Sequence, residues 1–208
     1  MLVLGTRTFA EEVADLVSDV PGLRVAAFVE NLDRDHPATL NDLPVLWIDD
    51  VVELAPSHVA VCALSTTHRH RFVEQAAALG VRFATVVHPT ARVSSRSDVG
   101  EGSIVSAGVV VGSHTRIGRH VILNRGALVG HHTEIGDFVS VQPGANVAGA
   151  CRIGEGTYVG MGALVLDRVS VGSRSLVGAG ALVTKDVADN VEVRGVPARV
   201  VRENVDGR

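Results

Sequence analysis

Aromatic residues are scarce in this 208-residue chain and make up 3% of it. A large globular core normally contains many of these bulky side chains, so their scarcity favours a narrow core filled by small aliphatic ones. Cysteine is also sparse, with only Cys62 and Cys151. Two cysteines do not make a disulfide framework, and we expect Cys151 to be a reduced packing residue.

The chain lacks a block of basic residues, and its formal net charge is −4. This charge balance argues against a nucleic-acid partner. The N-terminal residues contain no basic signal region, and no apolar run is long enough to cross a bilayer. We therefore expect a cytoplasmic protein with no membrane partner.

A strict six-residue repeat runs from residue 93 to residue 183. Every sixth residue is aliphatic, and the residue two places before it is small or β-branched and uncharged. A period of six fits neither a helix of 3.6 residues per turn nor a plain two-residue alternation. The aliphatic positions are Val93, Val99, Val105, Val111, Ile117, Leu123, Val129, Ile135, Val141, Val147, Ile153, Val159, Val165, Val171, Val177 and Val183.

This repeat predicts a parallel β-helix. Two inward side chains in every six residues give one short strand and a bend, so eighteen residues close a three-sided coil. Strands of successive coils then pair in parallel at about 4.8 Å. Glycine often follows the aliphatic residue, as at Gly100, Gly112 and Gly130. Because glycine tolerates a positive φ, we expect these glycines to form the corners.

A different pattern occupies the first 88 residues. Seventeen of the 22 glycines lie between residues 100 and 180, so the composition changes near residue 90. Before that point, predicted strands near 2–4, 23–29, 44–48, 58–64 and 81–87 are separated by helical segments, among them 66–79. We predict an α/β fold class for residues 1–88, a small Rossmann-like domain, followed by a β-helix over residues 89–208.

Two further runs of sequence carry a family resemblance. Residues 124–138 read NRGALVGHHTEIGDF, and residues 195–199 read GVPAR. With the hexapeptide repeat, these runs resemble the left-handed β-helix acyltransferases, within them the group of bacterial sialic acid O-acetyltransferases and UDP-amino-sugar N-acetyltransferases. The resemblance implies a left-handed helix, acetyl-CoA as co-substrate, and a homotrimer with CoA in the groove between two β-helices.

The same resemblance implies an active-site coil. Asn124 and His131 match the spacing of the family's acceptor-positioning asparagine and its catalytic base, and we expect both from one subunit. We look for an oxyanion-stabilising N–H near Gly149, one coil above His131. His132 replaces the family's acidic neighbour of the base, and it can hydrogen-bond but brings no fixed negative charge. A carboxylate from an adjoining subunit is the alternative orienting group.

The resemblance also places acyl-CoA contacts in the later coils and just beyond them. Small residues let the pantetheine arm lie along the backbone, and a cation can meet the CoA phosphates. The expected contacts are Gly149, Met161, Ala179, Gly180, Lys185, Pro197 and Arg199.

In the family the N-terminal domain holds the nucleotide part of the sugar substrate. Here the turn after the first strand keeps only the first family glycine, Gly5, followed by Thr6 and Arg7. Glu30 and Asn31 stand where the family has acidic residues. These five residues are the expected substrate contacts. An ordinary turn between strand and helix, without a phosphate site, is the alternative for residues 5–7.

We predict an acetyl-CoA-dependent N-acetyltransferase that acts on the amino group of a nucleotide-linked sugar and holds no metal. A sugar O-acetyltransferase is the nearest alternative, because the β-helix motif serves both acceptors. A trimeric β-helix carbonic anhydrase is another, because His114, His120, His131 and His132 supply the ligand type for zinc. A scaffold that has lost catalysis is the non-enzymatic alternative.

Overall fold

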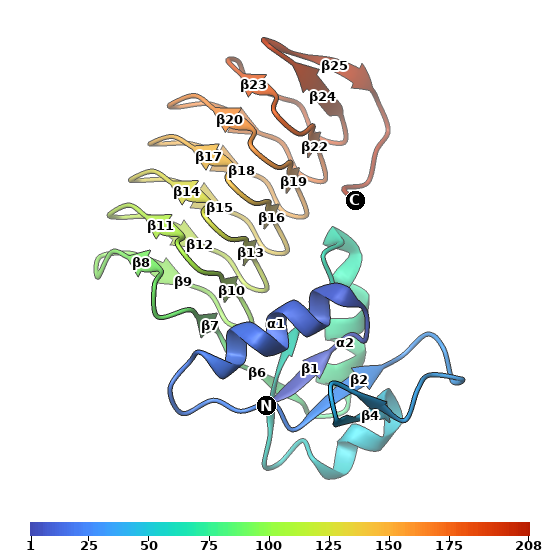
Figure 1. The fold of residues 1–208 in the computed structure, drawn as a ribbon. Helices are drawn as coiled ribbons and strands as arrows, with labels where there is room; N and C mark the ends of the chain where they lie inside the picture. The colour runs from blue at the N-terminus through green and yellow to red at the C-terminus, as the bar shows by residue number, and fades with distance from the viewer.

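The computed structural model describes all 208 residues, and it contains an N-terminal α/β domain and a tall β-helix (Figure 1). The first part consists of β1 (Leu2–Leu4), α1 (Thr8–Ser18), β2 (Ala27–Glu30), β3 (Thr39–Leu40), β4 (Leu43–Trp47), the 3-10 helix η1 (Ile48–Glu53), β5 (Val59–Cys62), the 3-10 helix η2 (Thr67–Arg69), α2 (His70–Ala78) and β6 (Arg82–Phe83). Its sheet has the order β3-β4-β2-β1-β5-β6 and is parallel except for β3. The predicted α/β class is confirmed.

Helical segments cover both faces of this sheet, so its central strands are buried on both sides. On one face α1 inserts Val13 into a cluster with Val3 and Phe28. On the other face α2 contributes Phe72 to a cluster with Leu4. Two-sided burial requires nearly continuous apolar strands, which is why these segments show no polar alternation in the sequence.

The β-helix has three faces of stacked two-residue strands. The covered face contains β7 (Val86–Val87), β10 (Ile104–Val105), β13 (Ile122–Leu123), β16 (Ser140–Val141), β19 (Tyr158–Val159), β22 (Leu176–Val177), β24 (Glu192–Gly195) and β25 (Ala198–Arg202). The apolar face contains β8 (Arg92–Val93), β11 (Val110–Val111), β14 (Leu128–Val129), β17 (Asn146–Val147), β20 (Leu164–Val165) and β23 (Leu182–Val183). The charged face contains β9 (Asp98–Val99), β12 (Arg116–Ile117), β15 (Glu134–Ile135), β18 (Arg152–Ile153) and β21 (Ser170–Val171).

The predicted repeat fills the inside of the coils. Aliphatic and small residues from the repeat dominate a single cluster of 25 buried residues. Hydroxyl groups at the small inward positions are satisfied by carbonyl groups of the next coil: Thr115 donates to the carbonyl of Gly130 at 2.7 Å and Thr157 to that of Gly172 at 2.6 Å. Buried hydroxyls therefore cost little here, because each finds an acceptor.

Glycine has a different role in the coils from the predicted one. The glycines that directly follow the aliphatic residues do not have positive φ. A Cβ at Gly130 would lie 2.5 Å from the carbonyl carbon of Ala148, so the close approach of the next coil excludes a side chain. Positive φ occurs two residues later, where Gly126, His132 and Phe138 all adopt it. The positive-φ position thus accepts several residue types, whereas positions such as Gly130, where the next coil comes close, leave no room for a side chain.

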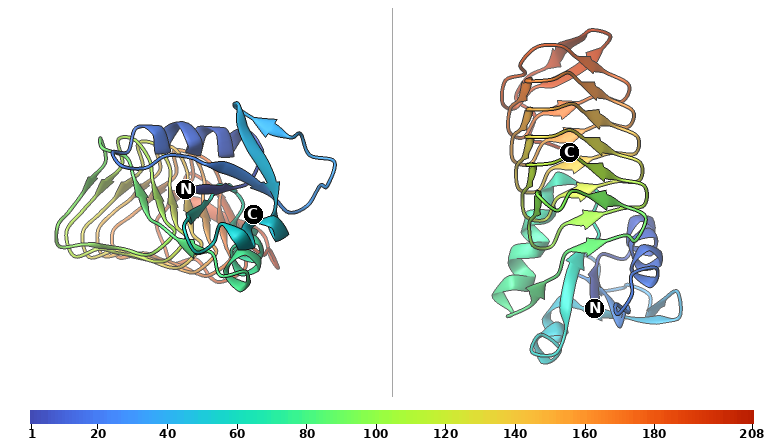
Figure 2. Two further views of the ribbon diagram at one scale, coloured as in Figure 1. Left: turned by 90° about the horizontal axis from the view of Figure 1, so that it is seen from below. Right: turned by 90° about the vertical axis from the view of Figure 1, so that its left-hand side faces the viewer.

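The α/β domain packs against the first coils of the covered face (Figure 2). Ile104 and Ile122 point outward from that face into the cluster around Val3 and Phe28. The predicted strand over residues 81–87 is two short strands, because β6 completes the α/β sheet whereas β7 pairs with β10. The division at residues 88 and 89 remains a prediction. No helix has the length and apolar character needed to span a bilayer.

Candidate active site

His131 and His132 form the corner between the apolar and charged faces, because they follow β14 and precede β15. Both side chains are exposed in the single chain. The His131 ring lies over Gly149 of the next coil, where a Cβ would be 2.8 Å from its Cε1 and Nε2 atoms. The N–H of Gly149 donates to no acceptor in the chain. A ring nitrogen able to accept a proton and a free N–H donor therefore lie side by side.

The two histidines are joined through their Nδ1 atoms, which lie 3.1 Å apart with the rings inclined at 85°. His132 also stacks on His114 of the previous coil, with ring centroids 4.8 Å apart and planes inclined by 19°. Both His114 and His132 have positive φ, so the corner conformation that repeats every coil aligns their rings. The orientation of His131 is thus tied to a second imidazole.

The nearby carboxylates are occupied by other partners. Glu134 pairs with Arg116 and Arg152 on the charged face, at 3.0 and 3.6 Å. Asp137 pairs with Arg119 at 2.8 Å. Burial raises the pKa of Asp137, but its hydrogen bonds with Arg119 hold the value below the ordinary one. None of these groups reaches His131 within the chain.

Asn124 lies at a different corner of the same coil. It follows β13, is buried, and its Oδ1 accepts a 2.8 Å hydrogen bond from the N–H of Arg125. Arg125 in turn pairs with Glu12 of α1. One whole face of the coil, the one that contains β14, separates Asn124 from His131. One chain therefore does not bring the two residues together, contrary to our expectation.

The residues predicted to bind CoA are divided between the same two corners. Lys185 lies in the same column as His131 and Gly149, two coils beyond Gly149 with Asp167 between them, and is exposed. Met161 and Ala179 lie at the corner that holds Asn124 and line a hollow of about 670 Å³. The expected CoA contacts thus flank the apolar face from both sides.

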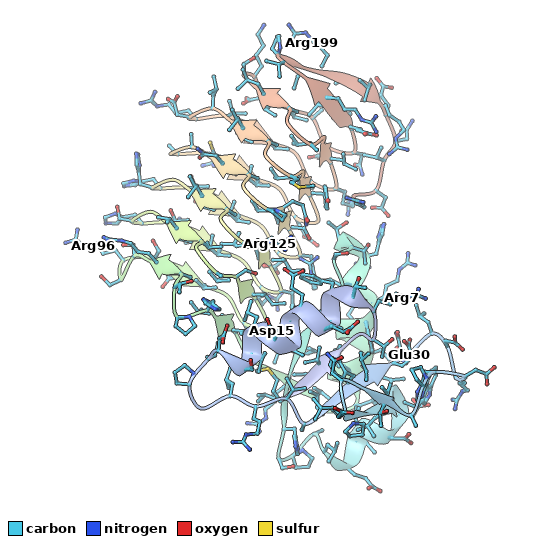
Figure 3. The ribbon with its side chains drawn as sticks, viewed as in Figure 1. Arg7, Asp15, Glu30, Arg96, Arg125 and Arg199 are labelled. Carbon is cyan, nitrogen blue, oxygen red and sulfur yellow. The ribbon has the colours of Figure 1, made fainter.

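The other predicted CoA residues lie farther along. Gly180 occupies the positive-φ corner position next to Ala179. Pro197 follows a cis peptide bond in the turn between β24 and β25. Arg199 donates to the carbonyl of Ala198 at 2.8 Å and lies at the end of the β-helix far from the α/β domain (Figure 3).

The α/β domain uses Glu30 to shape its own loops. The Glu30 carboxylate accepts hydrogen bonds from the Thr6 hydroxyl and, at 2.8 Å each, from the N–H groups of Asn31 and Leu32. Burial raises the pKa of Glu30, but these hydrogen bonds hold it below the ordinary value. Glu30 therefore connects the turn after β1 to the end of β2, and the Asn31 side chain is directed to Gln75 at 2.9 Å.

Gly5 and Arg7 lie at the carboxyl end of β1. Gly5 has a φ of 124° and donates its N–H to Val29 at 2.9 Å. Arg7 is the N-cap of α1, is exposed, and makes no side-chain cap. A helix N-terminus with a free guanidinium beside it is suited to an anion.

The hollow at the Asn124 corner contains arginines that the sequence reasoning missed. Arg194 and Arg202 both pair with the buried Glu192, and Arg208 contacts the ring and hydroxyl of Tyr158. The antiparallel pairing of β24 with β25 sets Arg202 opposite Glu192, and Arg194 reaches the same carboxylate. The sequence contained a signal for this cluster. If residues 195–199 form the turn of a hairpin, Arg194 and Arg202 come to lie on its two adjacent strands.

Comparisons with known proteins extend over the whole chain. The acetyltransferase domain of PglB from Neisseria gonorrhoeae, solved with acetyl coenzyme A, is 32% identical, with 96% of this chain and 98% of that one covered and a TM-score of 0.89. WeeI from Acinetobacter baumannii is 30% identical, with coverages of 96% and 98% and a TM-score of 0.88. A variant of perosamine N-acetyltransferase from Caulobacter crescentus, solved with CoA and GDP-perosamine, is 29% identical, with coverages of 97% and 96% and a TM-score of 0.90.

The bacterial transferase hexapeptide family (six repeats) matches residues 150–185. A search of curated proteins found no match. Identity of 30% or more over nearly full length, together with the repeat, confirms the family resemblance and the left-handed β-helix that it implied. This chain belongs to the left-handed β-helix acetyltransferases that carry an N-terminal α/β domain.

Proposed function

We propose that the protein transfers the acetyl group of acetyl-CoA to the amino group of a nucleotide-linked sugar. The observation that carries this proposal is the His131 imidazole over Gly149, beside a free N–H, at a corner of an acetyltransferase β-helix. The relatives support the reactants, because PglB was solved with acetyl coenzyme A and the Caulobacter enzyme with CoA and GDP-perosamine.

In the proposed reaction, Nε2 of His131 takes a proton from the sugar amine as the amine nitrogen attacks the thioester carbonyl carbon. The N–H of Gly149 stabilises the oxyanion that forms on the carbonyl oxygen. The carbon–sulfur bond then breaks, and His131 returns the proton to the departing CoA sulfur. The products are the acetylated amine and free CoA, and the histidine is regenerated.

We further propose a homotrimer that assembles each active site from two copies. The outward residues of the apolar face support it: Val110, Leu128 and Leu164 are 40–44% exposed and form a stripe along the stacked strands that is interrupted by Asn146. The two corners that flank this stripe carry His131 and Asn124. Copies packed along it would place the His131 corner of one chain against the Asn124 corner of the next.

The nucleotide is assigned to the carboxyl edge of the α/β sheet, where ligands of parallel sheets commonly bind. Arg7 and the N-terminus of α1 would hold the diphosphate. Glu30 has a positioning role in this proposal, because its carboxylate already orders Thr6 and Asn31.

The test is an acetyl-transfer assay that follows CoA thiol release with a panel of nucleotide-linked amino sugars and their hydroxyl counterparts. We expect turnover with an amino sugar, and a loss of at least about 100-fold in His131→Ala with its oligomeric state unchanged by analytical ultracentrifugation. If that variant retained activity, His131 would not be the catalytic base. Turnover only with hydroxyl acceptors would identify an O-acetyltransferase.

A further inference from the structure

Within one chain the His131 corner has no carboxylate partner, which makes the neighbouring imidazole the candidate for orienting the base. His131 has one side-chain hydrogen bond, to the Nδ1 of His132 at 3.1 Å. We propose that His132 is the positioning residue of the base, that its neutral Nδ1 accepts a hydrogen bond from Nδ1–H of His131, and that His114 holds it in place. This inference rests on the proposed function.

The distance between the two Nδ1 atoms determines where the protons lie. Two bare imidazole nitrogens repel each other, and two protonated ones clash, so one of the pair donates and the other accepts. If His131 donates, its Nε2 keeps a lone pair and can act as a base. If His132 donates, the proton of His131 moves to Nε2 and the base is blocked. The active arrangement is therefore the one in which His132 accepts.

Proton transfer strengthens this hydrogen bond. When Nε2 of His131 takes the proton of the amine, the ring becomes a cation whose Nδ1–H still points at the neutral Nδ1 of His132. A hydrogen bond from a cationic donor is shorter and stronger than a neutral one. His132 thus stabilises the charge that develops on His131 without carrying a charge itself.

The fold keeps the ring of His132 in place in two ways. Its positive φ and its stack on His114, at 4.8 Å and 19°, fix the ring. Its column neighbour on the other side is Ala150, which is too small to reach the Nδ1 contact. A proton on Nδ1 of His132 would replace the acceptor with a second donor, so protonation of His132 competes with the hydrogen bond to His131.

The experiment compares three substitutions at one position. His132→Phe keeps a ring to stack on His114 but removes the acceptor, and we expect kcat to fall about 100-fold with little change in the KM for acetyl-CoA. His132→Asn places an amide oxygen near the former Nδ1, and asparagine accepts positive φ, so kcat should stay within about fivefold of wild type. His132→Asp supplies the family's fixed charge and should be at least as active. His58→Phe, in the loop before β5, is the matched control.

A measurement without turnover makes the inference independent of the proposed reaction. ¹⁵N NMR of the unliganded protein should show Nδ1 of His131 protonated and Nδ1 of His132 bare. The opposite assignment, or two bare Nδ1 atoms, would overturn the inference, as would full kcat in His132→Phe or an equal loss in His132→Asn. If the wild type acetylates no amino sugar, the proposed function fails, and the NMR result still decides the proton arrangement.

Discussion

Arg69 in the α/β domain donates hydrogen bonds of 2.9 and 2.7 Å to the carbonyl oxygen of His120 in the β-helix. It also donates to the carbonyl of Val139 and the hydroxyl of Ser140, one coil farther on. Arg69 is 1% exposed and has no carboxylate partner, and burial lowers its pKa to about 10. One side chain therefore joins the α/β domain to two successive coils.

Replacement of Arg69 should loosen this junction. Arg69→Met leaves buried carbonyls without donors, so we expect the free energy of unfolding to fall by about 3 kcal/mol. Urea denaturation measures it. The exposed neighbour provides a control, since Arg71→Met should change stability by no more than about 0.5 kcal/mol. Equal stabilities of the two variants would show that the junction does not depend on the guanidinium.

His120 should make stability depend on pH. Burial, together with Arg69 and Arg119, lowers the pKa of His120 from 6.5 to about 4, and its Nδ1 is buried without a partner. Between these values the unfolded chain binds a proton that the folded protein does not, so the free energy of unfolding falls as pH decreases from 6.5 to 4.

His120→Phe should flatten this dependence. The new ring can keep the stack on Phe138 at 5.2 Å and the edge contact with Phe83 at 4.7 Å, and Phe138 shows that the corner accepts phenylalanine at positive φ. Urea denaturation of both proteins at several pH values between 4 and 7 gives the comparison. An unchanged slope in the variant would assign the effect to other groups.

A methyl group at Gly149 should damage the site without unfolding the protein. In Gly149→Ala the added Cβ would lie 2.8 Å from Nε2 of His131, so the ring must move. We expect kcat to drop about 100-fold. Gly108→Ala adds a methyl group 3.9 Å from its nearest neighbours at a φ of 68° and should lower stability by about 1 kcal/mol with normal kcat. Wild-type kcat in Gly149→Ala would contradict the placement of the base.

A charge on the apolar face should separate the copies. Leu128→Glu puts a carboxylate in the middle of the exposed stripe, so sedimentation should show smaller species and acetyl transfer should fall with assembly. Val52→Glu is a matched control, because Val52 is 52% exposed on the α/β domain. If both substitutions changed the sedimentation equally, or if Leu128→Glu did not change it, this face would be excluded as the interface.

Mixed trimers should test whether two chains share each site. His131→Ala and Asn124→Ala are each expected to be inactive alone. Co-expression of the two in equal amounts should restore about a quarter of wild-type activity. About half of the chains keep His131 and about half of their neighbours keep Asn124, so random assembly makes about one interface in four complete. No recovery would mean that both residues act within one chain.

The period of the repeat was sufficient to predict the β-helix. Side chains such as Val129 and Val147 recur every six residues, and no other regular backbone buries that spacing. The eighteen-residue coil also placed Gly149 one coil above His131 in the same column. The period did not reveal the glycine role at Gly130, because a clash with the next coil depends on how closely the coils stack.

The sequence by itself determined the three-sided core and the column that carries His131, since both follow from local spacing. Only the tertiary structure decided that Arg69 joins the domains and that the imidazoles of His131 and His132 meet at Nδ1. These relationships depend on rotamers and on contacts between segments far apart in the chain, which no periodicity encodes.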